Sequence, residues 1–179
     1  MLDDAVKMVR RHTPDFDMEK IPMDDPEVFR MLTEGRTSGV FQMESTGMTG
    51  VCLGLKPQSI EDITAIIALY RPGPMESIPR FIACKHDPKL VTYKHPSLKP
   101  ILSGTYGCIV YQEQVIKIFQ ELAGYSLGQA DMVRRAMSKK KHAVMEAERE
   151  HFVHGCTEPG HECPGCVANG ISEKVANEI

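Results

Sequence analysis

Residues 112–141 read QEQVIKIFQELAGYSLGQADMVRRAMSKKK, and this stretch decides the fold class. Over residues 112–123 the apolar side chains recur at the spacing of one face of a helix. Gly124 is a typical helix end, and the order Ser126-Leu127-Gly128-Gln129 is a capping box that opens another helix. Two successive helices with only a short turn between them predict a mainly α-helical protein.

Helix starts also recur upstream of this stretch. Asp25 with Pro26 is an acidic cap followed by proline in the first turn, Ser45 can cap a short helix, and Ser59 caps an apolar helix over residues 59–70. The apolar segments 38–42 and 107–111 are typical of short strands, the first of them alternatively of extended chain. We therefore expect a mainly α fold with a few short strands (α+β).

Length and composition are those of an ordinary globular protein. The chain has 179 residues, of which 42% are hydrophobic and 25% charged. No apolar run approaches the roughly 20 residues of a membrane span, and the first residues do not form a signal peptide. These features predict a cytoplasmic protein that does not interact with membranes.

The charges are distributed unevenly along the chain. Residues 66–142 hold twelve Lys or Arg and five Asp or Glu, a balance of +7 in a chain whose net charge is −3. A basic middle in an acidic chain favours contact with a polyanion, although chance clustering with salt bridges between segments would look the same.

Five cations lie within residues 134–141, directly after the capping box. Free amides at a helix start and nearby guanidinium groups suit phosphate oxygens. In the alternative interpretation, Asp131 pairs with Arg134 and Arg135 and the lysines are simply solvated. Arg71, before a Pro-Gly-Pro bend, could likewise bind a ligand or cap the carbonyl groups that end helix 59–70.

Four blocks resemble, in order and at similar spacing, the signatures of bacterial C-family replicative DNA polymerases (polymerase III alpha subunits). The blocks are GVFQMES at 39–45, IALYRPGP at 67–74, TYGCIVYQEQ at 105–114 and ADMVRRAMSKKK at 130–141. The similarity extends from about residue 20 to the end. It implies a helical domain of the polymerase fingers type, which grips the incoming deoxynucleotide (dNTP) and the template–primer DNA.

The resemblance also implies roles for individual residues. The residues that would bind the nucleotide or its phosphates are Arg134, Arg135, Lys139, Lys140 and Arg71. The residues that would contact DNA are Lys141, Tyr111 and Gln112.

The catalytic metal ligands of the family are not expected in this chain. Family members hold two Mg²⁺ ions with aspartates of the palm domain, which the resemblance places before Met1, so Mg²⁺ is expected only in the intact polymerase. The Pro14-Asp15-Phe16-Asp17 sequence imitates the metal-binding motif, but we interpret it as a surface turn. By the same resemblance, the other polymerase domains are partners, and the sliding clamp and clamp loader bind parts outside this chain.

A cysteine- and histidine-rich segment follows the basic run. Cys163 and Cys166 form a Cys-X-X-Cys pair, and Cys156 with His161, or alternatively His154, could complete a tetrahedral structural Zn²⁺ site. A reactive dithiol or a local disulfide is the alternative. The family does not generally carry this segment.

These observations predict three parts: a trailing helix and turn at 1–20, a fingers core at 21–150, and a Cys/His loop with a truncated helix at 151–179. The expected function is nucleotide and template–primer binding as a fragment of a DNA-directed DNA polymerase, catalytically incompetent alone. A stand-alone, zinc-stabilised nucleic-acid-binding module is the alternative.

Overall fold

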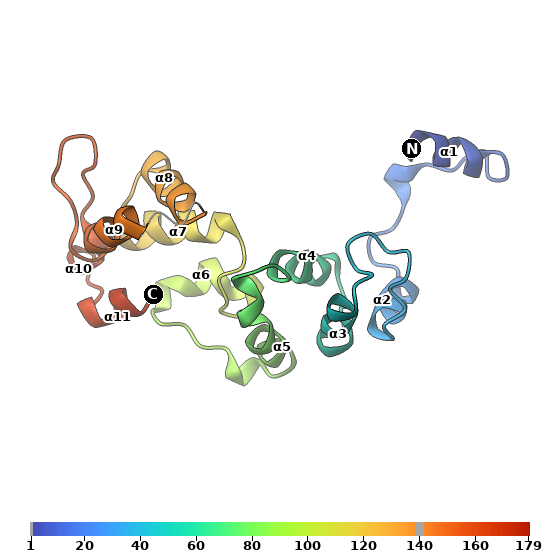
Figure 1. Cartoon of the computed structure of the whole chain (residues 1–179), viewed down its shortest axis with the longest axis horizontal. Helices are drawn as coiled ribbons and strands as arrows, with labels where there is room; N and C mark the ends of the chain where they lie inside the picture. The colour runs from blue at the N-terminus through green and yellow to red at the C-terminus, as the bar shows by residue number, and fades with distance from the viewer. Residues whose placement is uncertain (1, 139–141) are drawn as a thin grey trace. The chain divides into compact units, whose positions relative to one another are not determined.

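The computed structural model describes the backbone of residues 2–138 and 142–179, and the side chains of residues 2–137 and 144–179. Its elements are helical and are labelled along the chain in Figure 1. The α-helices are α1 (Leu2–Arg10), α2 (Pro26–Thr33), α3 (Thr46–Leu55), α4 (Ile60–Leu69), α5 (Ile78–His86), α6 (Lys99–Leu102), α7 (Gln112–Ala123), α8 (Leu127–Ser138), α9 (His142–His154), α10 (Gly165–Ala168) and α11 (Glu173–Glu178). Short 3₁₀ turns are η1 (Met18–Lys20), η2 (Pro74–Ser77), η3 (Pro88–Leu90), η4 (Pro96–Leu98) and η5 (Ser103–Thr105). The predicted mainly α fold is confirmed.

The helix caps expected from the sequence form as hydrogen bonds. Asp25 accepts from the Glu27 amide at 2.8 Å at the start of α2, and Ser45 accepts from the Met48 amide at 3.2 Å at the start of α3. Ser59 accepts from the Asp62 amide at 3.3 Å and so caps α4. These bonds satisfy amides that have no partner inside the helix, which is why such residues mark helix starts.

The two segments expected as short strands do not pair as strands. Residues 38–42 are a series of turns, because Gly39 and Gln42 both take positive φ angles, of 78° and 63°. Residues 107–111 begin with a turn at Gly107, whose φ is 80°, and the Gln114 side chain occupies the amides of Val110 and Tyr111 that a neighbouring strand would need. Within the described part of the chain, the single β-bridge joins Cys156 to Cys163.

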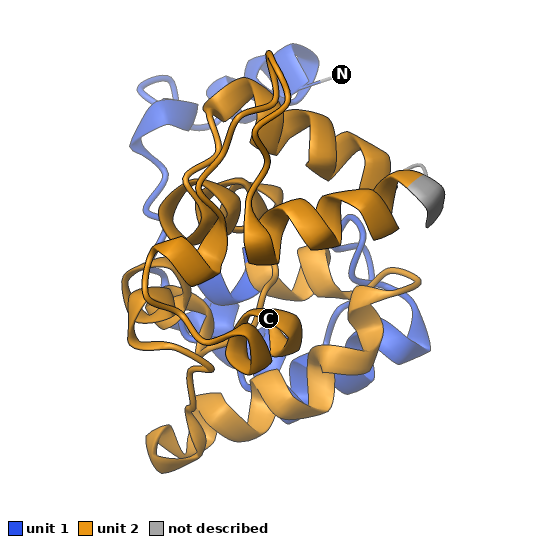
Figure 2. Cartoon of the chain, turned by 90° about the vertical axis from the view of Figure 1, so that its left-hand side faces the viewer, with its two compact units in different colours: residues 1–64 blue, residues 65–179 orange. Residues whose placement is uncertain are grey.

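The chain divides into two compact units, residues 1–64 and 65–179, coloured separately in Figure 2. In the first unit, α2 packs against α3 and buries Phe29, Leu32 and Cys52. The predicted boundaries at residues 20 and 150 do not coincide with this division and stay predictions.

The second unit contains the larger hydrophobic core, formed mainly by α7, α8, α9 and α10. The half-buried Phe119 packs against this core, with ring centroids 5.1 Å from Tyr125 and 4.8 Å from Phe152 in edge-to-face contacts. The apolar face predicted for residues 112–123 thus packs against the helices that follow it. No helix in the described part of the chain is long and apolar enough to cross a membrane.

Candidate functional site

The basic helix α8 begins with the predicted capping box. The Gln129 amide donates to Ser126 Oγ at 3.3 Å, and the Ser126 amide donates to Gln129 Oε1 at 2.7 Å. Gln129 also donates through Nε2 to the carbonyl of Glu162 at 3.3 Å. The start of α8 is therefore fixed both by its own cap and by the Cys/His loop.

One turn further along α8, a single carboxylate holds both arginines. Asp131 Oδ1 accepts from Arg134 Nε at 2.8 Å, and Asp131 Oδ2 lies 2.8 Å from Arg135 Nε. The hydrogen bond from Arg134, together with the charge of both arginines, lowers the pKa of Asp131. The pairing that the alternative interpretation required is thus present, yet the Arg135 side chain remains 68% exposed.

Gln112 joins this group from a different helix. Its Oε1 accepts from Arg134 Nη1 at 2.8 Å, although the two residues are 22 positions apart. We call Gln112, Asp131, Arg134 and Arg135 the arginine clamp. It brings together two of the predicted nucleotide-binding residues and one predicted DNA-binding residue, while Tyr111 precedes Gln112 as the N-cap residue of α7.

The other predicted basic residues are not part of the arginine clamp. Lys139, Lys140 and Lys141 lie outside the described residues. Arg71 is exposed just after α4, next to a turn in which Gly73 has a φ of 101°. Among the described residues, no hydrogen bond or ion pair connects the Arg71 side chain to the clamp or to the end of α4.

A buried amide positions the segment that precedes Gln112. Gln114 is 8% exposed, and its Oε1 accepts from the amides of Val110 and Tyr111 at 2.8 and 2.9 Å. Its Nε2 donates to Thr105 Oγ1 at 2.8 Å and to the Ile101 carbonyl at 3.3 Å. A buried polar side chain with all its groups paired holds its surroundings in one arrangement.

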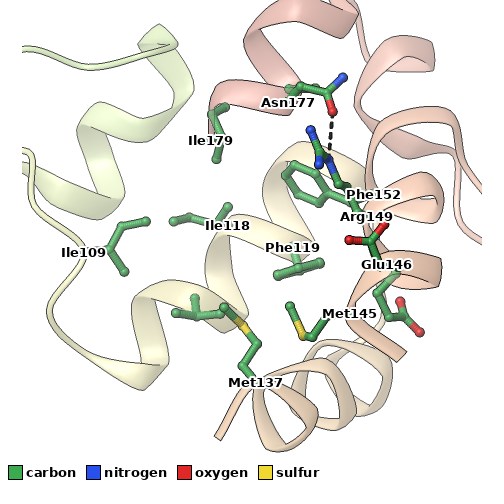
Figure 3. Close-up of a pocket in the computed structure, with 13 residues that line it drawn as sticks. Ile109, Ile118, Phe119, Met137, Met145, Glu146, Arg149, Phe152, Asn177 and Ile179 are labelled. Carbon is green, nitrogen blue, oxygen red and sulfur yellow. Dashed lines mark hydrogen bonds between the residues drawn. The ribbon is translucent and has the colours of Figure 1, made fainter. Parts of the chain in front are cut away.

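An apolar cavity of about 360 Å³ opens beside the same helices, and Figure 3 shows the side chains that line it. Ile118 and Phe119 come from α7, Met137 from α8 and Phe152 from α9. Arg149 Nε donates to Asn177 Oδ1 at 3.0 Å at the rim, drawn as the dashed line. The lining is mainly apolar, and Glu146, Glu148 and Arg149 are its charged residues.

Asp15 and Asp17 occupy a surface turn, as expected. Asp15 is exposed, and Asp17 accepts from the Glu19 amide at 3.1 Å as the cap of η1. The Asp17 side chain lies 3.6 Å from the Lys20 ammonium group. These roles are local and do not place the two carboxylates around a common metal.

The cysteines of the Cys/His loop are buried and reduced. Cys156 and Cys163 face each other across the β-bridge, with both backbone hydrogen bonds at 2.9 Å. Cys166 belongs to the hydrophobic core, and its burial raises the pKa of its thiol to about 12. His154, 48% exposed, lies 3.9 Å from carboxylate oxygens of Glu150 and Glu173.

The structure assembles a different group of potential metal ligands. Glu148, His151 and His161 each offer one ligand atom, and these atoms lie within 4.8 Å of one another. Of the predicted zinc ligands, only His161 belongs to this group, and the site built on the three thiols stays a prediction. The sequence signal for the new group was the Glu-X-X-His spacing of Glu148 and His151, which places both on one side of α9.

Comparison with known proteins gives a consistent result. Residues 1–160 match the family model for the bacterial DNA polymerase III alpha subunit finger domain. The chain is 54% identical over 145 residues to the DNA polymerase III subunit alpha of Staphylococcus aureus (strain Mu50 / ATCC 700699), covering 81% of this chain and 14% of that protein. It is 51% identical over 163 residues to the subunit of Staphylococcus epidermidis (strain ATCC 12228 / FDA PCI 1200), covering 91% and 14% respectively. The chain thus spans about 14% of the length of these relatives.

Proposed function

The chain belongs to the finger-domain family of bacterial DNA polymerase III alpha subunits, and from this premise we propose that it binds the triphosphate of an incoming dNTP. In this proposal it also contacts template–primer DNA during replication in the cytoplasm. Its partners are the other domains of a DNA-directed DNA polymerase. The two catalytic Mg²⁺ ions belong to palm aspartates of the intact polymerase, so the chain does not extend a primer alone.

The arginine clamp is the observation that carries the proposal. Asp131 and Gln112 hold Arg134 in a defined position, and Arg135 presents most of its side chain to solvent. A guanidinium group binds phosphate oxygens through paired hydrogen bonds, and a pre-positioned group loses less entropy on binding. Asp131 neutralises only one of the two positive charges, so the clamp keeps a net positive charge for an anionic ligand.

The remaining assignments rest on the resemblance to the family. In this proposal Lys139 and Lys140 add charge near the nucleotide phosphates, and Arg71 contributes to nucleotide binding. Lys141, Tyr111 and Gln112 face the DNA. Each lysine or arginine that meets a DNA phosphate adds a salt-dependent contribution, because binding releases condensed counterions.

Steady-state kinetics of the polymerase that carries this sequence test the proposal. Arg134→Ala combined with Arg135→Ala is expected to lower kcat/KM for the dNTP by about 10- to 100-fold, since a hydrogen bond to a charged group contributes roughly 1.5–3 kcal/mol. Arg30→Ala is the matched control. Arg30 is also an exposed arginine bound to two carboxylates, of Glu27 and Glu34, but it lies in the first unit.

Three results would oppose the proposal. If the double variant keeps a normal kcat/KM, the clamp does not bind the nucleotide. If the double variant loses DNA affinity in a salt-dependent assay while nucleotide kinetics are unchanged, the alternative of a plain nucleic-acid-binding module is favoured. Activity of the 179-residue chain alone in primer extension would refute the expected catalytic incompetence.

A further inference from the structure

We propose that Glu148, His151 and His161 bind a divalent transition-metal cation of the zinc class, which fastens the loop at residues 155–164 to α9. This site is separate from the arginine clamp and does not depend on nucleotide binding. Glu148 and His151 come from α9, and His161 comes from the loop. A cation between them would therefore join two segments of the second unit.

The distances are close to those of a shared metal. His161 Nε2 lies 3.1 Å from Glu148 Oε1, and His151 Nδ1 lies 4.0 Å from Glu148 Oε2. Ligand atoms about 2.0–2.1 Å from a tetrahedral zinc ion are roughly 3.3 Å apart. The rings of His151 and His161 have centroids 5.1 Å apart and are tilted by 56°. All three ligand atoms lie within 4.8 Å of one another, so an inward movement of His151 closes the site.

One buried nitrogen has no partner without a cation. His151 Nδ1 is enclosed, and it makes no hydrogen bond with any described residue. The Glu148 carboxylate is too distant, at 4.0 Å, to accept a hydrogen bond from it. Because a buried polar atom left unpaired is costly, a ligand at this point is expected. A metal ion would pair with His151 Nδ1, His161 Nε2 and the carboxylate together.

The donor set selects the class of cation. Two imidazole nitrogens and one carboxylate suit zinc and its transition-metal neighbours, whereas Ca²⁺ and Mg²⁺ prefer oxygen ligands alone. Glu148 is 6% exposed, and Tyr125 Oη donates to its Oε2 at 3.0 Å. A hydrogen bond of this kind orients a ligating carboxylate, so Tyr125 is a positioning residue for the site.

The cation would mainly stabilise the loop at residues 155–164. Its base is closed by the backbone β-bridge between Cys156 and Cys163. The backbone also approaches closely at Gly165, where an added Cβ would lie 2.2 Å from the Gly155 nitrogen. Its far part has few apolar contacts, because residues 157–160 are exposed. Glu162 in turn accepts the hydrogen bond from Gln129. A cation at His161 would thus steady the loop that contacts the start of α8.

Zinc binding to the reduced, metal-free 179-residue chain tests the proposal. Titration is expected to give about one equivalent of zinc per chain, with His161→Gln weakening the affinity by at least about 100-fold. Tyr125→Phe, which keeps the ring, is expected to weaken it by about 10-fold. His154→Gln is the matched control, since His154 lies on α9 outside the group, and it should leave the affinity unchanged.

Cobalt(II) in place of zinc identifies the donor atoms even if a variant folds poorly. Nitrogen and oxygen ligands give visible d–d bands without a thiolate-to-metal charge-transfer band in the near ultraviolet. A strong thiolate band, or loss of binding in Cys156→Ser with His151→Gln unaffected, would overturn the proposal in favour of the thiol site. Absence of stoichiometric zinc binding to the folded wild-type chain would also overturn it. Circular dichroism establishes that each compared variant is folded.

Discussion

Replacing Gln114 by leucine is expected to destabilise the second unit by about 2–3 kcal/mol. The substitution leaves the amides of Val110 and Tyr111 without their acceptor, and each unsatisfied buried donor costs roughly 1–3 kcal/mol. Both amides belong to half-buried residues, so water can partly replace the lost acceptor, and the total lies in the lower part of the roughly 2–6 kcal/mol expected for two such donors. The leucine side chain itself fills most of the vacated volume.

The assay is urea denaturation of the 179-residue chain followed by far-ultraviolet circular dichroism, with the free energy of unfolding taken from a linear extrapolation. Gln120→Leu is the control, because Gln120 is a half-buried glutamine on the same helix. Its side chain makes no hydrogen bond among the described residues, so we expect a change of no more than about 0.5 kcal/mol.

Thr105 provides an internal check of the network. Thr105 Oγ1 accepts from Gln114 and donates to the Cys108 carbonyl at 2.6 Å, and Thr105 is 2% exposed. Thr105→Val combined with Gln114→Leu should lower the free energy of unfolding by less than the sum of the two single losses. The difference should be at least about 0.5 kcal/mol, because the two side chains share one network. Additive costs, or a loss below about 1 kcal/mol for Gln114→Leu, would refute the reasoning.

Three further changes probe other parts of the second unit. Ser126→Ala removes the cap of α8 and should lower the free energy of unfolding by about 1 kcal/mol, measured by urea denaturation; an unchanged midpoint would contradict the capping role. In the same assay, Gly165→Ala should lower the free energy of unfolding by at least about 1 kcal/mol more than Gly170→Ala does. Both positions have positive φ, of 78° and 83°, but only at Gly165 does the new Cβ meet backbone atoms, so equal costs would argue against the close contact. The folded pKa of Asp131 lies below its ordinary value of 3.8, so the stability from its arginine contacts is present above that value and is lost as the pH falls through the lower, folded pKa. In Arg134→Ala the pKa of Asp131, measured by carboxyl-carbon NMR titration, should lie closer to the ordinary value. A normal pKa in the unmodified chain would count against the clamp.

Much of the candidate site followed from local rules. The capping box at Ser126 and the pairing of Asp131 with Arg134 and Arg135 involve residues three or four positions apart, and such neighbours meet on any helix. The order and spacing of the four blocks were enough to indicate the polymerase family, and the match over residues 1–160 confirmed it. The thiol-based zinc site rested on the proximity of its residues in sequence and remains a prediction.

The sequence alone determined the mainly helical fold, the helix starts and the family, because these depend on spacing and on capping side chains within a few residues. Only the tertiary structure decided which distant groups meet: Gln112 with Arg134, Gln114 with Ile101 and Thr105, and His161 with Glu148. The physical reason is that hydrogen bonds between residues far apart in sequence depend on how helices pack. Local sequence spacing does not predict which of these side chains packing brings together. The segment 107–111 did not form a strand for a local reason, since the Gln114 side chain took the amides of Val110 and Tyr111 that a sheet would have used.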